Sequence, residues 1–231
     1  MTRTEFAGMV DMVELAPATT REEVKALVED ACRFHFHSLG CPYCYHPYAA
    51  ALLKEKGCSK TVMLLGGGGF ADGNWPTQVK LNSIALCLQT GCGEIDLTSN
   101  LGWIKSGMWQ EYGEEIRQAR SLARGVPLKV IIHAPQLTDP ELERACGILL
   151  ENGADYVKTD TGRSPQPTSP EQVRRIREIV GDKMRIKASG GIRRAEDAKR
   201  MKEAGADRLG IRHGAAIQIW KELADLDAAG A

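Results

Sequence analysis

Three stretches of the sequence repeat one junction, in which a glycine closes a helical pattern and an acidic residue and a short apolar run follow. They read TGCGEIDLTSN, NGADYVKTDTG and AGADRLGIRHG. A glycine just past a helix end commonly adopts the left-handed conformation that terminates the helix. We therefore expect Gly91, Gly153 and Gly205 to mark equivalent joins between a helix and the next strand.

The same alternation of strand and helix extends along the whole chain. Eight alternations in 231 residues favour one (β/α)8 barrel domain over residues 1–231. A doubly wound open sheet is the alternative, but it normally has fewer strands, and no G-x-G-x-x-G motif opens the first helix. The expected strands are residues 10–15, 36–41, 61–66, 94–99, 128–133, 156–160, 185–189 and 208–212. The expected helices are residues 21–34, 47–57, 76–91, 109–124, 139–153, 169–182, 194–205 and 215–226.

Charge and cysteine content exclude several classes of protein. Lysine plus arginine and aspartate plus glutamate number 30 each, so no overall field attracts nucleic acid or an anionic membrane. No apolar run approaches the ~20 residues of a membrane span, and no signal peptide is evident. Seven scattered cysteines do not form a secreted disulfide framework. We expect a cytoplasmic enzyme or binding protein.

The repeat places three charged side chains in one region of the predicted barrel. Counting five residues from each marker glycine gives Asp96, Lys158 and Gly210 as equivalent positions. Alternate strands of such a barrel share an interior layer, and the active site lies at the C-terminal strand ends. Asp96 and Lys158 should therefore meet at the barrel mouth, with Lys187 from the intervening strand beside them. A structural ion pair with solvent-reaching lysines is the alternative.

Two lysines beside a carboxylate are typical of carbonyl activation through a Schiff base. The attacking amine must be neutral, whereas an unperturbed lysine has a pKa of ~10.4. A neighbouring ammonium group and a desolvated pocket both lower that pKa. A carboxylate within reach can move the protons that the reaction requires. This reasoning leaves open which of the two lysines is the nucleophile.

Four motifs, YVKTDTGR, IKASGGIR, EIDLTSNLGWIKSG and LKVIIHAPQLTD, resemble those of the deoxyribose-phosphate aldolase family of class I aldolases. The resemblance runs in the same order from about Asp11 to the last helix. It implies that Lys158 forms the Schiff base, Lys187 perturbs its pKa and Asp96 relays protons, with no cofactor or metal. It further implies substrate contacts at Asp11, Cys44, Thr161, Gly162, Arg163, Gly190, Gly191, Arg193, Gly210, Arg212 and His213.

Several positions depart from the family pattern. The usual small-residue phosphate loop is replaced by Gly210–Gly214, in which Arg212 either contacts an anion or fills the phosphate space. The sequence GGGGFADG stands where the family has Gly-Phe-Pro-x-Gly. Its run Gly66–Gly69 predicts either close backbone approach or a flexible loop. Asp160 replaces a serine beside the nucleophile, and Glu14 adds a carboxylate near the pocket mouth.

The segment HFHSLGCPYCYHP invites a metal interpretation, which we disfavour. Structural zinc sites need four ligands, whereas this segment has one cysteine pair. Strand alternation would also place His35 and His37 on one face, away from the loop. Cys44-x-x-Pro47 instead matches a motif of the family and predicts a thiol at the pocket edge. His133, at the end of an apolar strand, is interpreted as a packing residue.

The leading hypothesis is a cofactor-free class I aldolase, an aldehyde-lyase that acts on a small aldehyde or ketose that is phosphorylated or otherwise anionic. We expect a homo-oligomer, most simply a dimer, that binds neither nucleic acid nor membrane. Two alternatives stay open. One is a biosynthetic aldol synthase with a ketose-phosphate donor, and the other is a non-catalytic barrel that binds an anionic metabolite.

Overall fold

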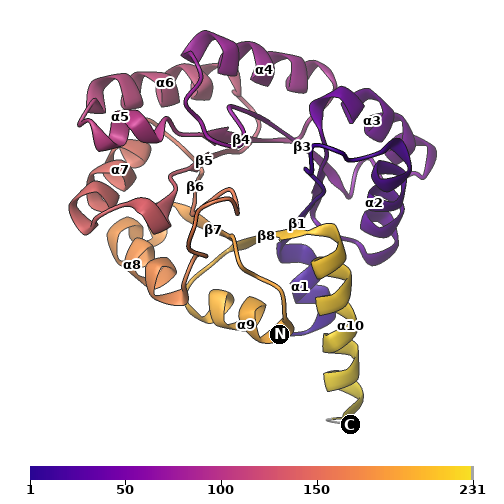
Figure 1. Ribbon diagram of the computed structural model, residues 1–231. Coiled ribbons are helices and arrows are strands. Elements are labelled where there is room, and N and C mark those ends of the chain that lie inside the picture. Colours follow the sequence, from indigo (N-terminus) through magenta and orange to yellow (C-terminus); the bar gives the residue numbers. More distant parts are fainter. Residues whose placement is uncertain (230–231) are drawn as a thin grey trace.

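Eight parallel strands pair in chain order and close into a barrel, with β1 beside β8 (Figure 1). The computed structural model describes residues 1–229, so residues 230–231 of the predicted domain lie outside the described residues. The predicted (β/α)8 fold is confirmed. The strands are β1 (Val10–Val13), β2 (Ser38–Gly40), β3 (Met63–Gly68), β4 (Glu94–Thr98), β5 (Leu128–Ile131), β6 (Tyr156–Lys158), β7 (Arg185–Ser189) and β8 (Arg208–Arg212).

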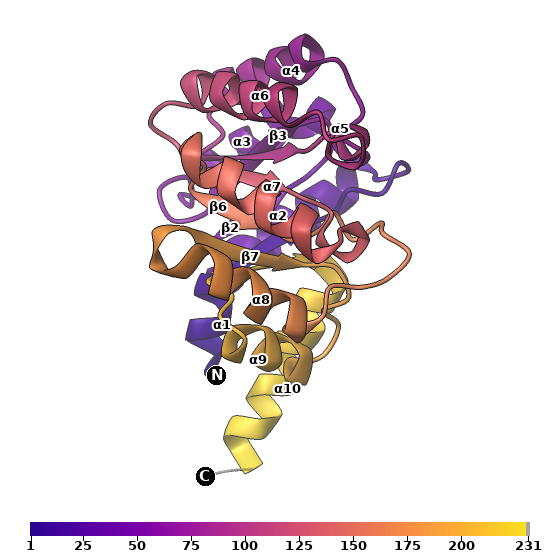
Figure 2. The ribbon, with the colours of Figure 1, turned by 90° about the vertical axis from the view of Figure 1, so that its left-hand side faces the viewer.

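A ring of helices surrounds the barrel, and the last of them extends past its edge (Figure 2). All eight expected helices are present. Two further helices, α1 and α5, were not expected from the sequence, although Thr2 and Asn100 cap their first turns. The helices are α1 (Arg3–Met9), α2 (Arg21–Phe34), α3 (His46–Glu55), α4 (Thr77–Gln89), α5 (Leu101–Lys105), α6 (Trp109–Leu122), α7 (Asp139–Glu151), α8 (Pro170–Val180), α9 (Ala195–Glu203) and α10 (His213–Ala229).

The three marker glycines end their helices as the repeat predicts. Gly91, Gly153 and Gly205 have φ angles of 83°, 73° and 106°. At each corner the N–H of the residue after the glycine donates to the carbonyl of the residue five positions earlier, at 3.0 to 3.2 Å. This is the Schellman motif, which brings the side chains of those two residues together. The three corners therefore have the same local geometry.

Two expected strands, β2 and β3, begin two residues later than the sequence suggests. His35 adopts a left-handed conformation with φ of 57° at the end of α2, and β2 starts only at Ser38. The expectation that His35 and His37 share one strand face is therefore wrong, because neither residue lies in the strand. His37 instead bonds through Nε2 to Glu94 Oε1 at 3.1 Å.

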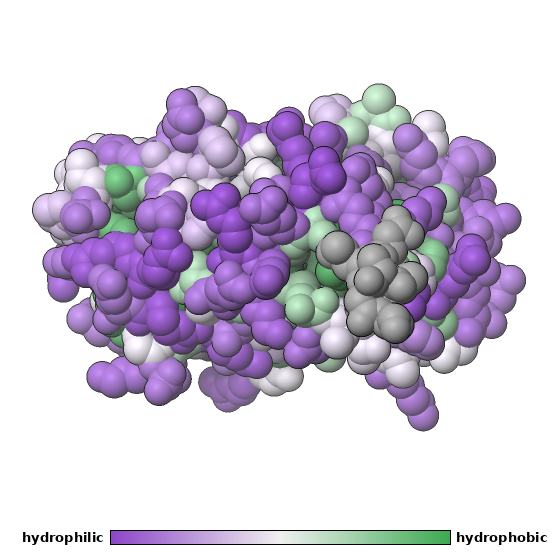
Figure 3. All heavy atoms as spheres, turned by 90° about the horizontal axis from the view of Figure 1, so that it is seen from below, coloured by the Kyte–Doolittle hydropathy of each residue, from purple (hydrophilic) through white to green (hydrophobic). Residues whose placement is uncertain are grey.

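Apolar side chains fill the space between the strands and the helices, whereas the barrel interior is charged. Strand register places Lys158 beside Lys187, and Asp96 beside Lys129. The face of the molecule shown in Figure 3 is mostly hydrophilic, with apolar side chains in small patches. Within residues 1–229, no helix has the length and apolar character that crossing a membrane requires. The buried charged side chains inside the barrel are Asp11, Glu94, Asp96, Lys129, Lys158, Lys187 and Arg208.

Candidate active site

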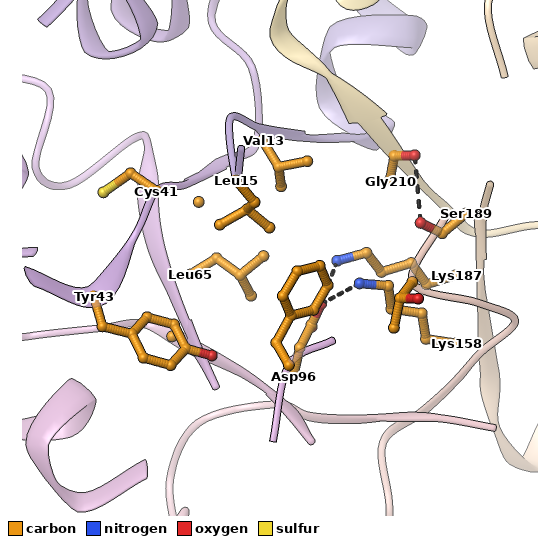
Figure 4. Close-up of a pocket in the computed structure, with 14 residues that line it drawn as sticks. Val13, Leu15, Cys41, Tyr43, Leu65, Asp96, Lys158, Lys187, Ser189 and Gly210 are labelled. Atoms are coloured by element: carbon orange, nitrogen blue, oxygen red, sulfur yellow. Dashed lines mark hydrogen bonds and ion pairs between the residues drawn. The ribbon is translucent and has the colours of Figure 1, made fainter. Parts of the chain in front are cut away.

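A pocket opens at the C-terminal ends of the strands, and Asp96, Lys158 and Lys187 lie at its base (Figure 4). We call these three residues the upper cluster. Lys158 Nζ donates to Asp96 Oδ2 at 2.7 Å, and Lys187 Nζ donates to the same oxygen at 3.0 Å. The other carboxylate oxygen, Asp96 Oδ1, is buried without a hydrogen-bond partner among the described residues. One oxygen therefore holds the two lysines, and the other is available to a substrate hydroxyl or a water.

The pKa values of Lys158 and Asp96 are both lowered, for different reasons. Burial lowers the pKa of Lys158 to about 8, and the charge of Lys187 acts in the same direction while Asp96 opposes it. Burial alone would raise the pKa of Asp96, but Lys158 and Lys187 together lower it to about 2. At pH 7, Asp96 is therefore ionised, and roughly a tenth of Lys158 is the neutral amine, compared with well under a thousandth for an unperturbed lysine.

A second charged group lies deeper in the barrel and touches the upper cluster through Lys187. We call Asp11, Glu94, Lys129 and Arg208 the lower cluster. Asp11 Oδ2 lies 2.6 Å from both Lys187 Nζ and Lys129 Nζ. Arg208 Nη1 lies 3.1 Å from Asp11 Oδ1 and 3.6 Å from Glu94 Oε1, and Lys129 also bonds to Glu94. Lys187 is thus the only member of the upper cluster within the described residues that also pairs with Asp11.

The sequence analysis missed most of the lower cluster. Of its members only Asp11 was named there, as a substrate contact, whereas the structure places it beneath Lys187 with no exposure. Lys129 stands inside the apolar run LKVIIH, and Glu94 opens EIDLTS. A charged residue at an inward position of a predicted buried strand is the signal that could have identified them.

Other expected substrate contacts line the pocket or lie against its wall. Thr161 and Gly210 are among the lining residues. Arg163 lies at the rim, where its Nη2 donates to the carbonyl of Leu15 at 3.3 Å and its guanidinium lies 5.9 Å from the Phe70 ring centre. Leu15 and Phe70 both line the pocket, so Arg163 is a cation held at its entrance.

The glycines of the two motifs shape neighbouring loops. A side chain at Gly190 would lie 3.5 Å from the Gly162 Cα atom, and a side chain at Gly191 would lie 2.5 Å from Pro167. Gly210 allows Lys187 to pass, because a Cβ atom there would lie 3.2 Å from Lys187 Cε and 2.6 Å from Ser189 Oγ. Ser189, which lines the pocket, was not singled out from the sequence.

Of the eleven expected contacts, only Thr161 and Gly210 line the pocket within the described residues, and the other nine include four whose side chains are exposed or paired elsewhere. Cys44 is exposed, and the lining thiol is Cys41. Arg193 and Arg212 are both exposed to solvent. His213 bonds through Nε2 to Asp30 Oδ2 of α2 at 2.7 Å. The structure therefore does not bring these side chains together with the upper cluster.

Asp160 orders the loop after β6 instead of facing the pocket. Its Oδ2 accepts from the N–H of Gly162 at 2.7 Å, and its Oδ1 accepts from Ser164 Oγ at 2.6 Å. His133 Nδ1 lies 3.7 Å from Asp160 Oδ1. The burial expected for His133 is present, but its neighbour is this carboxylate and its backbone is left-handed with φ of 55°.

Close backbone approach explains the run of four glycines. A Cβ atom at Gly67 would lie 2.3 Å from the Asp96 carbonyl oxygen and 2.8 Å from the Tyr43 hydroxyl oxygen. Cβ atoms at Gly66, Gly68 and Gly69 would lie 2.5 to 2.9 Å from neighbouring atoms. The alternative of a flexible loop does not hold for Gly66–Gly68, which belong to β3.

Comparison with known proteins gives a consistent result over nearly the whole chain. The model of the DeoC/LacD family of aldolases matches residues 8–218. The deoxyribose-phosphate aldolase of Desulfitobacterium hafniense is 37% identical over 214 residues, which cover 92% of this chain and 96% of that enzyme. That of Carboxydothermus hydrogenoformans is 37% identical over 93% of this chain and 94% of its own. The tetrameric deoxyribose phosphate aldolase of Aeropyrum pernix superimposes with a TM-score of 0.86 at 30% identity, covering 97% and 93% of the two chains.

Proposed function

Because the chain belongs to the DeoC/LacD family of aldolases and is an aldehyde-lyase of the class I type, we propose that Lys158 is its Schiff-base nucleophile. The observation that carries this assignment is the position of Lys158 Nζ in the pocket, 2.7 Å from Asp96 Oδ2. Lys187 is fully buried beneath it and pairs with two carboxylates, Asp11 and Asp96. The positive charge of Lys187 lowers the pKa of Lys158 and so favours its neutral amine.

The proposed substrate is 2-deoxyribose 5-phosphate, after the names of the relatives. The amine of Lys158 adds to the C1 aldehyde of the open-chain sugar, and loss of water gives a protonated imine. Asp96 accepts the proton of the C3 hydroxyl, directly or through water, while the C2–C3 bond breaks and its electron pair forms an enamine. Glyceraldehyde 3-phosphate leaves. Protonation of the enamine at C2 and hydrolysis of the imine then release acetaldehyde and restore Lys158.

Arg163 is the cation that we assign to the phosphate end of the substrate. Arg163 and Arg212 are both exposed and neither lines the pocket, but Arg163 contacts two lining residues, Leu15 and Phe70. A guanidinium can bind phosphate with two parallel hydrogen bonds. We expect Arg163→Ala to raise the KM for the phosphorylated sugar and leave that for unphosphorylated 2-deoxyribose unchanged, with Arg212→Ala as the matched comparison. An equal effect on both sugars would contradict the assignment.

Reductive trapping tests the nucleophile. Incubation with acetaldehyde and borohydride should leave an ethyl group on the peptide that contains Lys158, as peptide mass spectrometry would show. Lys158→Met should form no such adduct and lose turnover on the order of 10⁶-fold, as removal of a catalytic nucleophile does elsewhere. An ethyl group on Lys187 instead would overturn the assignment. Parallel incubation with dihydroxyacetone phosphate, followed by product analysis, separates the aldehyde donor from a ketose-phosphate donor.

The assembly state is the remaining part of the proposal. We predict a homo-oligomer, most simply a dimer, and light scattering on the purified chain measures it directly.

A further inference from the structure

The corner between α4 and β4 carries two cysteines at positions that the other two marker-glycine corners fill differently. The Schellman motif places the third-last helical residue against the residue that follows the glycine. At Gly91 these residues are Cys87 and Cys92, joined by a backbone hydrogen bond of 3.2 Å. The equivalent pairs at the other corners are Leu149 with Ala154 and Met201 with Ala206. Packing alone therefore does not require sulfur at this corner.

A histidine from a different helix completes the group. His46, at the start of α3, places Nδ1 3.4 Å from Cys92 Sγ. One ligand atom from each of His46, Cys87 and Cys92 lies within 4.8 Å of the other two, and all three residues are buried. The second ring nitrogen, His46 Nε2, is buried without a hydrogen-bond partner among the described residues. Because Nδ1 faces Cys92 Sγ, Nδ1 is the ring nitrogen that is placed to bind an ion.

Strand β3 has a glycine, Gly66, where the two cysteine sulfurs pack against it. A Cβ atom at Gly66 would lie 2.5 Å from Cys87 Cβ and 3.0 Å from both Cys87 Sγ and Cys92 Sγ. Only glycine at this position lets both sulfurs pack against the strand. The carbonyl oxygen of Gly67, the next residue, accepts a hydrogen bond from Ser83 Oγ at 3.0 Å and lies 3.8 Å from Cys87 Sγ, which leaves it one further lone pair.

A second group of residues with ligand-type side chains does not resemble this one. Asp11, His37 and Glu94 also lie within 4.8 Å of one another. Lys129 and Arg208 already occupy the space between these carboxylates and balance their charge. A metal ion at Asp11, His37 and Glu94 would have to displace Lys129 and Arg208. Among the described residues, no lysine or arginine pairs with Cys87, Cys92 or His46.

We propose that Cys87, Cys92 and His46 form a buried binding site for a thiophilic d10 metal ion, Zn²⁺ or Cu⁺. Soft thiolates and imidazole are the ligands that select these ions. The three donors complete a trigonal site for Cu⁺, whereas Zn²⁺ is almost always four-coordinate in structural sites and would take the Gly67 carbonyl as its fourth ligand. Binding converts two thiols to thiolates and releases their two protons to solvent.

The site would support one wall of the catalytic pocket. An ion bound there would join α3 and the α4–β4 corner behind β3. The Tyr43 ring lies 5.1 Å from the His46 ring, and Tyr43 lines the pocket. Because the site is closed to solvent, the ion would enter during folding and leave slowly.

Refolding in the presence of each ion tests the proposal. The full chain is unfolded in urea with a reductant and refolded with one equivalent of Zn²⁺, with Cu⁺ kept reduced by ascorbate, or with a chelator. After desalting, elemental analysis should give one ion per chain in at least one metal arm, with a higher Tm than in the chelator arm. Cys87→Ser and Cys92→Ser should each lose the ion and the Tm difference. Cys146→Ala, which removes a buried thiol of α7, should retain both.

The extended X-ray absorption fine structure of the bound metal provides a test on the unmodified chain. This test does not depend on whether the variants fold. Two sulfur neighbours at about 2.3 Å, one nitrogen at about 2.0 Å and one oxygen at about 2.0–2.2 Å are expected around Zn²⁺. A shell of oxygen and nitrogen alone, no stoichiometric ion in either arm, or full binding in the Cys87→Ser/Cys92→Ser double variant would each overturn the proposal. Aldolase turnover, measured separately, has no bearing on this outcome.

Discussion

Lys158 and Lys129 are two buried lysines of one barrel whose pKa values shift in opposite directions from the ordinary value. Burial lowers the pKa of Lys158 to about 8, and the single carboxylate near it does not reverse this effect. Burial acts on Lys129 in the same direction, yet Asp11, Asp96 and Glu94 together raise its pKa above the ordinary value. Burial by itself therefore does not decide whether a barrel lysine becomes a nucleophile.

The difference between the two pKa shifts follows from the ratio of cations to carboxylates in the upper and the lower cluster. The upper cluster has two lysines that share one oxygen of Asp96, whereas the lower cluster offers Lys129 both Asp11 and Glu94. An unpaired buried charge is costly, and a paired one much less so. The lower cluster therefore keeps Lys129 charged, whereas the upper cluster leaves the amine of Lys158 partly neutral.

Removing the carboxylate of the upper cluster should have the largest effect. Asp96→Asn deletes the proposed proton acceptor, so we expect kcat to fall by roughly 10²- to 10⁴-fold. Asp96 raises the pKa of Lys158, so the acidic limb of the kcat/KM profile should move to lower pH in the variant. Steady-state rates from pH 5 to 10 measure both effects. Unchanged kcat would show that another group moves the proton.

Removing the cation of the lower cluster should affect stability rather than chemistry. Lys129→Met leaves Asp11 and Glu94 buried with one positive partner fewer, which we expect to destabilise the fold by about 3–5 kcal/mol. Urea unfolding measures the change. The double variant Lys129→Met/Glu94→Gln, which removes one of the carboxylates as well, should recover part of the loss. Adduct formation at Lys158 should persist, and its disappearance would show that the two clusters are not separable.

Lys129 also shows where sequence-based prediction stopped. The marker glycines predicted the helix ends, and the count of five residues placed Asp96 and Lys158 on one layer, because both follow from local backbone periods. Lys129 lies in the same barrel at a position in register with Asp96. Its role depends on which carboxylates face it from β1 and β4, and these are contacts between strands far apart in sequence.

The loop residues were predicted least well for the same reason. Arg212 ends β8 and His213 begins α10, but His213 pairs with Asp30 of α2 and Arg212 faces solvent. Asp160 departs from the family pattern close to Lys158, yet its carboxylate accepts hydrogen bonds within its own loop. Motif position identifies which residues are near the mouth of the barrel, and only the loop conformation decides where each side chain points.

Neutralising the lysine that joins the two clusters should have a smaller effect with a definite sign. Lys187 lowers the pKa of Lys158, so Lys187→Met should raise that pKa. Below pH 8 the neutral fraction of Lys158 then falls, and a rise of about one unit would reduce kcat/KM at pH 7 roughly tenfold. Above the new pKa the loss should shrink. The acidic limb of the pH–rate profile therefore moves in the direction opposite to that of Asp96→Asn.

A surface lysine provides the control for this shift. Lys202→Met removes a positive charge on α9 that pairs with Glu5 outside the barrel, and its profile should match that of the unmodified chain. Reductive trapping with acetaldehyde across the same pH range follows Lys158 without the later steps of turnover. If Lys187→Met left the midpoint of trapping unchanged, burial alone would set the reactivity of Lys158, and the ratio of cations to carboxylates would not explain its difference from Lys129.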